Sequence, residues 1–143
     1  MNKLVLFLIV MCCCNSVFAQ KYTEKYNKEA FSIAMNWLKE INQDNFDDAY
    51  FLLTKENRSN YKKDEWIGYI QNLKSDFGYL KSRECDTLFF VNTYEGKGDG
   101  FYVIVEFNVD YENTDNHIEY IVLEQNENME WRILSFTYST TLK

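Results

Sequence analysis

From Tyr26 onward the apolar residues recur at every third or fourth position, which is the spacing of a helix with one buried face. A second, shorter helix is expected after a cap at Asp44 or Asn45. A third is expected to begin near Asp64 and to end at Gly78, because acids favour a helix start and glycine favours its end. The polar stretch from Thr54 to Lys63 is expected to connect the second helix to the third. Three helices therefore precede any strand.

After Gly78 the hydrophobic period changes to two, and β-branched and aromatic residues become frequent, as is typical of strands. Short polar segments separate the expected strands and fit hairpin connections, so the strands should form an antiparallel meander. The predicted fold class is α+β, with three N-terminal helices packed on a curved four-stranded antiparallel sheet. The expected strands are Leu80–Val91, Phe101–Tyr111, His117–Glu124 and Trp131–Tyr138.

The second expected strand has apolar residues on both of its faces. Phe101, Val103 and Val105 lie on the face expected to pack on the helices, while Tyr102 and Ile104 lie on the opposite face. Sheet curvature and helix overlap would explain the second apolar face. A dimer or partner surface is the alternative.

The first 19 residues have the order of a secretory signal peptide: a basic residue at Lys3, an apolar run from Leu4 to Met11, and Ala19 at the expected cleavage point. The run is shorter than the roughly 20 residues that a membrane-spanning helix needs. We therefore expect removal of residues 1–19, a single domain over residues 20–143, no transmembrane segment after cleavage, and a location in the periplasm or outside the cell.

Lipid attachment at Cys12, Cys13 or Cys14 would give an envelope-anchored protein instead. The large Met11 stands where such signals have a small residue, so removal at Ala19 is the favoured interpretation. Cleavage there would leave Cys85 as the single cysteine and would exclude an internal disulfide. The mature domain would then depend on its own hydrophobic core.

The formal net charge of the chain is −7, and loss of Lys3 would make it more negative. Phosphate backbones are bound by lysine and arginine, so nucleic acid is not an expected partner. The glycines at positions 96, 98 and 100 precede a strand rather than a helix, which argues against a phosphate-binding loop. One mature cysteine and one histidine do not make a zinc site, and no metal or cofactor is expected.

Two groups of side chains are candidates for catalysis. Cys85 would need His117 as its base, but a small core cysteine and a surface histidine are the favoured interpretation. Glu84 and Asp86 share one strand face, opposite Arg83, and would suit acid–base chemistry if that face lined a pocket. Exposed acids beside a cross-strand lysine are favoured for this pair.

The order of elements and a set of short motifs resemble the family described as domain of unknown function 4019. The resemblance implies a cone-shaped α+β fold similar to the superfamily of nuclear transport factor two and ketosteroid isomerase, and it implies no activity. The motifs that carry it are Trp37-Leu38, Phe46 with Ala49-Tyr50, Trp66, Phe77-Gly78, Lys81-Ser82-Arg83, Gly100-Phe101-Tyr102-Val103 and Trp131-Arg132-Ile133.

Aromatic residues make up 17% of the chain, and no complete catalytic set is evident. The leading hypothesis is a non-catalytic exported module that binds a small apolar ligand or a protein partner, with Trp37, Trp66, Tyr102 and Ile104 as its candidate contacts.

Two alternatives stay open. One is an enzyme similar to ketosteroid isomerase, with Glu84 or Asp86 as base and Tyr102 or Tyr120 stabilising an oxyanion. The other is a structural homodimer formed through Tyr102, Ile104 and their neighbours.

Overall fold

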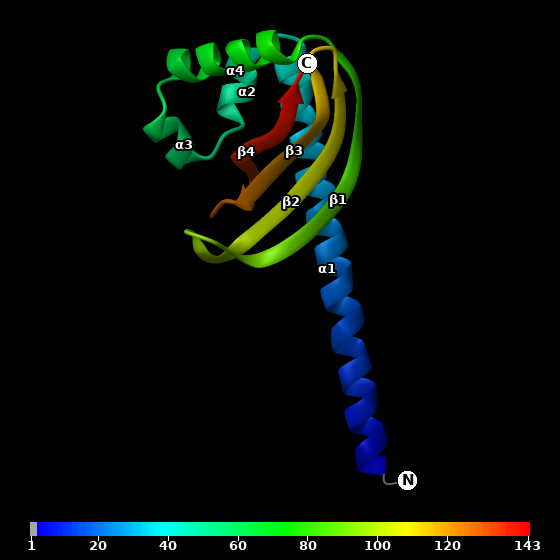
Figure 1. Ribbon diagram of the computed structural model, residues 1–143. Helices are drawn as coiled ribbons and strands as arrows, with labels where there is room; N and C mark the ends of the chain where they lie inside the picture. The colour runs from blue at the N-terminus through cyan, green and yellow to red at the C-terminus, as the bar shows by residue number, and fades with distance from the viewer. Residues whose placement is uncertain (1–2) are drawn as a thin grey trace.

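The computed structural model describes the backbone of residues 3–143 and the side chains of residues 21–143. Four helices precede four strands in the chain (Figure 1). The predicted signal peptide lies outside the residues whose side chains are described, so its removal stays a prediction. The elements are α1 (Lys3–Asn42), α2 (Phe46–Phe51), α3 (Lys55–Asn60), α4 (Lys63–Phe77), β1 (Leu80–Tyr94), β2 (Gly98–Tyr111), β3 (Thr114–Gln125) and β4 (Trp131–Leu142).

The prediction of three helices was wrong, because the polar stretch from Thr54 to Lys63 contains the short helix α3. This helix buries none of its side chains, so it leaves no apolar spacing in the sequence. It depends on local hydrogen bonds instead: the Thr54 side chain caps its start by accepting from the backbone N–H of Asn57 at 3.3 Å. The part of the chain that precedes the strands therefore contains four helices.

The predicted antiparallel meander is confirmed, since the strands are arranged in the order β1-β2-β3-β4. The hairpin between β1 and β2 is longer than expected and closes at Tyr94 and Gly98. Register shifts interrupt the pairing of β1 with β2 at three places, and such bulges bend a sheet. The α+β class is thus confirmed, while the expected cone shape stays a prediction.

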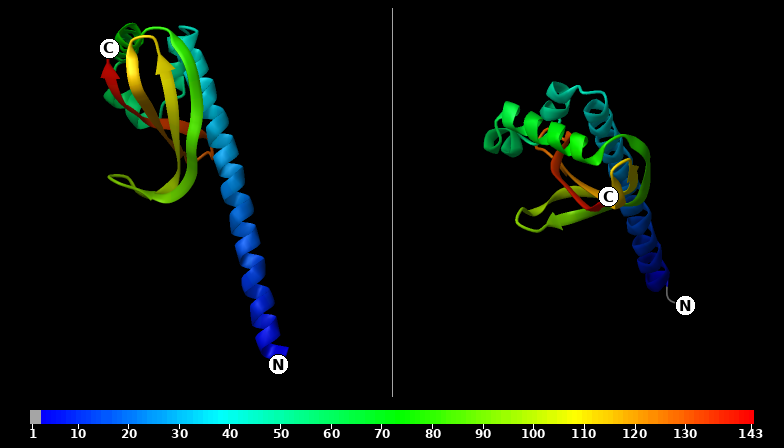
Figure 2. Two further views of the ribbon diagram at one scale, coloured as in Figure 1. Left: turned by 45° about the vertical axis from the view of Figure 1, so that its right-hand side comes forward. Right: turned by 45° about the horizontal axis from the view of Figure 1, so that its top comes forward.

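One face of the sheet packs against α1 and α4 and forms the main core (Figure 2). Ala30, Ala34 and Trp37 lie on successive turns of α1, and the two alanines allow the helix to approach the strands closely. From β2, the predicted inner residues Val103, Val105, Phe107 and Val109 are buried in this core. Phe101 belongs to the same row but is 47% exposed, and its ring meets those of Tyr26 and Phe90 at the edge of the core.

The opposite face carries a second, smaller core of Tyr102, Val122 and Leu134. The β1–β2 hairpin curls beneath α3 (Figure 1), and Lys97 near its tip forms an ion pair with Glu56 of α3. Partly buried residues of the same hairpin, Val91 and Tyr94 among them, pack on this core. The curvature of the chain's own sheet therefore accounts for the apolar residues on this face.

Candidate functional site

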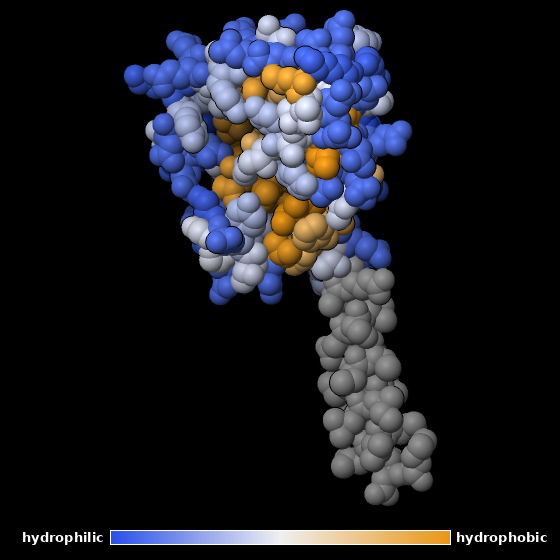
Figure 3. All heavy atoms as spheres, in the orientation of Figure 1, coloured by the Kyte–Doolittle hydropathy of each residue, from blue (hydrophilic) through white to orange (hydrophobic). Residues whose placement is uncertain are grey.

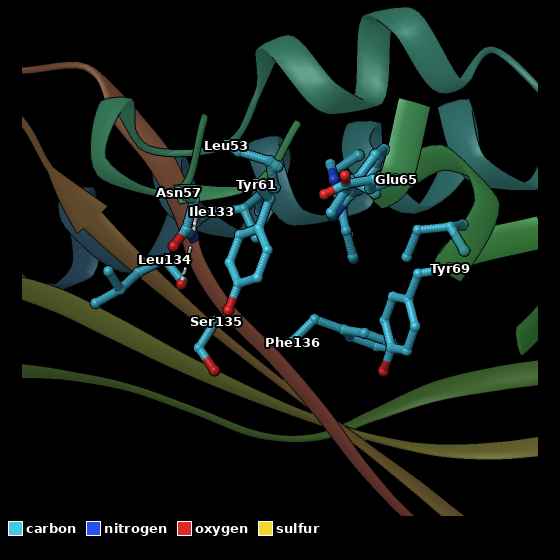
Figure 4. Close-up of a pocket in the computed structure, with 12 residues that line it drawn as sticks. Leu53, Asn57, Tyr61, Glu65, Tyr69, Ile133, Leu134, Ser135 and Phe136 are labelled. Atoms are coloured by element: carbon cyan, nitrogen blue, oxygen red, sulfur yellow. Dashed lines mark hydrogen bonds between the residues drawn. The ribbon is translucent and has the colours of Figure 1, made fainter. Parts of the chain in front are cut away.

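A cleft of about 520 Å³ opens between the α3–α4 region and strand β4. Hydrophobic residues are visible in the hollow between the polar helices and the sheet (Figure 3). The volume is in the range of small-molecule sites. The close-up in Figure 4 shows the lining side chains, which are Trp37, Leu53, Asn57, Tyr61, Glu65, Trp66, Tyr69, Ile70, Ile133, Leu134, Ser135 and Phe136.

Backbone hydrogen bonds join the segment before α3 to the edge of β4 and fix one end of the cleft. The N–H of Thr54 donates to the carbonyl of Ile133 at 3.0 Å, and the N–H of Ile133 donates to the carbonyl of Leu52 at 2.9 Å. The Asn57 side chain then donates to the carbonyl of Leu134 at 2.7 Å, a contact drawn in Figure 4. These bonds satisfy edge groups of β4 and hold α3 in place.

Five of the twelve residues that line the cleft are aromatic. The Tyr50 hydroxyl lies within hydrogen-bond distance of two carbonyl oxygens, that of Tyr61 at 2.8 Å and that of Arg58 at 3.0 Å, and so ties α2 to the chain around α3. The Trp66 ring lies 5.6 Å from that of Tyr50 and 6.5 Å from that of Trp37. The buried rings of Tyr50 and Trp37 thus support the partly exposed ring of Trp66.

The rings of Tyr61 and Tyr69 face the solvent, with exposures of 56% and 51%. Burial of its remaining surface raises the pKa of Tyr69, so this phenol stays neutral at physiological pH. Two exposed tyrosines beside Trp66 give the cleft exposed ring surface. Such surface is available to a ligand.

Few polar groups line the cleft. The carboxylate of Glu65 lies 3.5 Å from the ammonium group of Lys62 and is largely exposed. Trp37 is 1% exposed, and its Nε1 has no hydrogen-bond partner among the described residues. A buried indole N–H without a partner is uncommon, because losing its hydrogen bond to water is costly. Trp37 lies in the wall between the cleft and a smaller hollow beside it.

A second group of polar side chains is buried on the helix-covered face of the sheet. It consists of Arg83, Tyr111 and Glu119, which come from three adjacent strands. Arg83 donates from Nε to Glu119 Oε2 at 2.8 Å and from Nη2 to Glu119 Oε1 at 3.1 Å. Its Nη2 also donates to the Tyr111 hydroxyl at 2.8 Å, and that hydroxyl donates to Glu119 Oε1 at 2.8 Å. We call these three residues the Arg83–Glu119 cluster.

His117 lies beside this cluster, with Nε2 3.7 Å from Glu119 Oε1 and its ring packed against Phe77 and Tyr111. Burial tends to raise the pKa of Glu119, but His117 and the Arg83 guanidinium together hold that pKa below its usual range. Burial and the neighbouring carboxylate raise the pKa of Tyr111. The carboxyl is therefore charged and the phenol neutral, and an ionised carboxylate of low pKa is a weak base.

A hollow of about 30 Å³ adjoins the Arg83–Glu119 cluster. Trp37, Ile70 and Phe136 line both this hollow and the cleft, so they form the partition between the two. The hollow has room for a water molecule and for little else.

The sequence-predicted residues lie in different places. Trp37 and Trp66 line the cleft together. Tyr102 and Ile104 belong to the small core on the opposite face, where Tyr102 is 2% exposed. Burial is the main reason that the pKa of Tyr102 is raised. The four candidates thus form two groups on different faces of the sheet.

Glu84 and Asp86 are exposed on the outer face of β1, and neither lines the cleft or the hollow. Asp86 accepts hydrogen bonds from Thr87 at 3.1 Å and from Asn108 at 3.3 Å. Arg83 points to the opposite face, as alternation predicts. The carboxylate that faces the interior is Glu119, which sequence reasoning missed although it follows His117 by two residues on one strand face.

Cys85 and His117 are not brought together. Cys85 is exposed on β1 and His117 is buried on β3, with β2 between them. The expectations of a core cysteine and a surface histidine were both wrong, since Cys85 is exposed and the His117 ring is enclosed by Phe77, Tyr111 and Tyr138. Burial and the adjacent Asp86 raise the pKa of the Cys85 thiol, which disfavours a reactive thiolate.

Fold and cleft define a small α+β module with a cleft, lined in part by aromatic residues, at one edge of its sheet. A family model described as "Protein of unknown function (DUF4019)" matches residues 33–136, and the chain belongs to this family. No curated protein matches the chain.

No helix in the described part of the chain has both the length and the apolar character that a bilayer crossing requires. Among the same residues, no three His, Cys, Asp or Glu side chains are placed to hold a metal ion.

Proposed function

We propose that this protein is a non-catalytic exported module whose cleft binds a small, largely apolar ligand with an aromatic or other planar part. The observation that carries the proposal is the aromatic cleft of about 520 Å³ with a buried, unpartnered indole N–H in its wall. Export rests on the signal-like order of residues 1–19.

The wall composition supports a planar, apolar ligand. Trp66, Tyr61 and Tyr69 offer ring surfaces for stacking, and Trp37 offers one hydrogen-bond donor. A ligand with one acceptor on an apolar ring system would satisfy the indole N–H and cover the exposed rings. Few placed polar groups in an apolar cavity are typical of sites that bind small molecules.

The distribution of carboxylates supports binding rather than acid–base catalysis. Glu119 is committed to Arg83 and Tyr111, and its pKa is below the usual range. Glu84 and Asp86 line neither the cleft nor the hollow, and Glu65, which does line the cleft, is largely exposed and lies 3.5 Å from the ammonium group of Lys62. The enzyme alternative therefore has less support.

The test uses N-phenyl-1-naphthylamine, a neutral aromatic probe whose fluorescence rises in apolar sites. We expect saturable binding of one probe per chain, weakened roughly tenfold or more by Trp66→Ala or Tyr69→Ala, each of which removes a stacking ring. The matched control is Tyr79→Ala, because Tyr79 is 73% exposed and does not line the cleft. Binding that does not saturate, or that all three variants weaken equally, would contradict the proposal.

A further inference from the structure

The two edge strands of the sheet, β1 and β4, differ in their protection against pairing with another strand. The β1 edge carries four charged residues within one short stretch, Lys81, Arg83, Glu84 and Asp86. Its pairing with β2 is also interrupted by three register shifts. Charged side chains and bulges are the usual means by which sheet edges resist strand addition.

The β4 edge is less protected: its pairing with β3 has two register shifts, and Arg132 is its single charged residue. Residues 133–142 contain no charged residue and no proline. Outside its pairing with β3, β4 has one bridge, from Ile133 to Leu53, and among the described residues no strand pairs with the rest of this side. Most of the remaining edge is exposed, namely Thr137, Tyr138, Ser139, Thr141 and Leu142.

We propose that residues 137–142 of β4 pair antiparallel with the same segment of a second copy of this chain. A two-fold axis perpendicular to the sheet would then join two four-stranded sheets into one continuous sheet. The free backbone groups of the two edges would satisfy each other.

The side chains of this segment match their own copies. Thr137 and Ser139 lie opposite Tyr120 and Ile118 of β3, on the outer face, whereas Tyr138 lies opposite Glu119 on the helix-covered face. Antiparallel pairing about the two-fold axis sets hydroxyl side chains beside hydroxyl side chains on one face. On the other face it sets Tyr138 beside Thr140 or Leu142 of the second copy, and cross-strand pairs of hydroxyl side chains are favourable.

Charge also favours a second copy over a foreign charged peptide. The chain carries a net charge of −7, so two copies can approach closely only where acidic side chains are absent. The residues that flank the segment, Arg132 and Lys143, already form ion pairs with Glu130 at 2.9 Å and Asp115 at 3.4 Å. The edge between them is neutral and lacks a charge that would select a charged partner.

The protected β1 edge limits the assembly to two copies. Each chain has one free edge, and the two free edges are used up when they pair with each other. A sheet with two free edges would add copies without end, as fibres do. The expected product is therefore a closed dimer.

Sedimentation equilibrium of the purified protein over a range of micromolar concentrations tests the proposal. We expect a dimer, and we expect Thr137→Lys with Ser139→Lys to weaken it roughly tenfold or more, because four ammonium groups would meet at the new pairing. The matched control is Ser82→Lys, which adds a charge to an exposed position of the β1 edge and should leave the dimer intact. Far-ultraviolet circular dichroism confirms that each variant is folded.

Cross-linking keeps the proposal testable if the lysine variant does not fold. In a Cys85→Ser background, Thr137→Cys or Ser139→Cys should form an intermolecular disulfide on mild oxidation, whereas Ser82→Cys should not. A monomer at all concentrations, a dimer that survives both lysines, or cross-linking through β1 as efficient as through β4 would each overturn the proposal. Oligomers larger than a dimer would overturn it as well.

Discussion

The cleft and the Arg83–Glu119 cluster share a wall of Trp37, Ile70 and Phe136, yet they satisfy their polar groups in opposite ways. In the cluster, Glu119 accepts from both Arg83 and Tyr111, so its buried charge is compensated by neighbours. In the cleft, rings are exposed and the indole N–H of Trp37 has no partner among the described residues. Arg83, Tyr111 and Glu119 thus satisfy one another, although the ring nitrogens of the neighbouring His117 have no hydrogen-bond partner among the described residues. The cleft instead has exposed ring surface to offer a ligand.

The largest expected effect is on the cluster. Glu119→Ala would leave the buried Arg83 guanidinium without its counter-ion, and we expect the free energy of unfolding to fall by about 3–5 kcal/mol. Urea denaturation measures this change. The control is Arg83→Met with Glu119→Leu, which removes both charges and should cost less than the single change. A double variant that is no more stable than Glu119→Ala would show that the ion pair is not the source of the loss.

A smaller effect is expected at the turn that leads from α4 into β1 and so to Arg83. Gly78 has φ 75° and ψ −157°, a conformation restricted to glycine, and an added Cβ would lie 2.8 Å from Asn113 Nδ2. Gly78→Ala should destabilise the protein by about 1–3 kcal/mol.

Gly68→Ala is the matched control for this turn. An added Cβ at Gly68, inside α4, meets no atom within 4 Å, so alanine there should stabilise the protein by about 0.5–1 kcal/mol. Thermal unfolding of both variants checks the opposite signs. Equal shifts would mean that backbone strain at Gly78 is unimportant.

The pH dependence of stability should also come from the cluster. Because the pKa of Glu119 is lower in the folded protein than in the unfolded chain, its ionisation stabilises the fold above the unfolded pKa of about 4.3. That contribution is lost as the pH falls through the folded pKa. Urea denaturation at several pH values should show the stability gap between the wild type and Glu119→Gln narrowing below about pH 4.3. A constant gap would contradict this assignment.

The smallest effect on stability is expected in the cleft. Tyr69 is 51% exposed, so Tyr69→Ala should change the free energy of unfolding by about 0.5 kcal/mol or less. The same variant should lose most of its binding of the aromatic probe. A large loss of stability would mean that Tyr69 belongs to the core, and the contrast between cleft and cluster would then disappear.

Periodicity was sufficient to predict the meander and most of the core. The alternation of Val103, Val105 and Phe107 is visible in the sequence, and these residues are buried against the helices as expected. The helix α3 was not predictable in this way, because it buries no side chain and is held by the Thr54 cap and by Asn57. Apolar spacing reports only on helices that have a buried face.

The candidate site was predictable in part. Trp37 and Trp66 were found because large aromatic residues at inward positions are visible in one segment at a time. Glu119 was missed because its role depends on Arg83, which lies 36 residues earlier in the chain. The chain has 22 acidic residues, and nothing in the sequence around Glu119 indicates that this one is buried.

The sequence by itself determined the α+β class, the order of the strands, the acidic charge and the membership of the DUF4019 family, since each of these depends on local pattern or composition. Only the tertiary structure decided which carboxylate is buried, which aromatic residues share a cleft, and which sheet edge is left free. These features depend on contacts between segments far apart in the chain. Such contacts follow from the curvature of the sheet and the packing of helices on it, which no local pattern specifies.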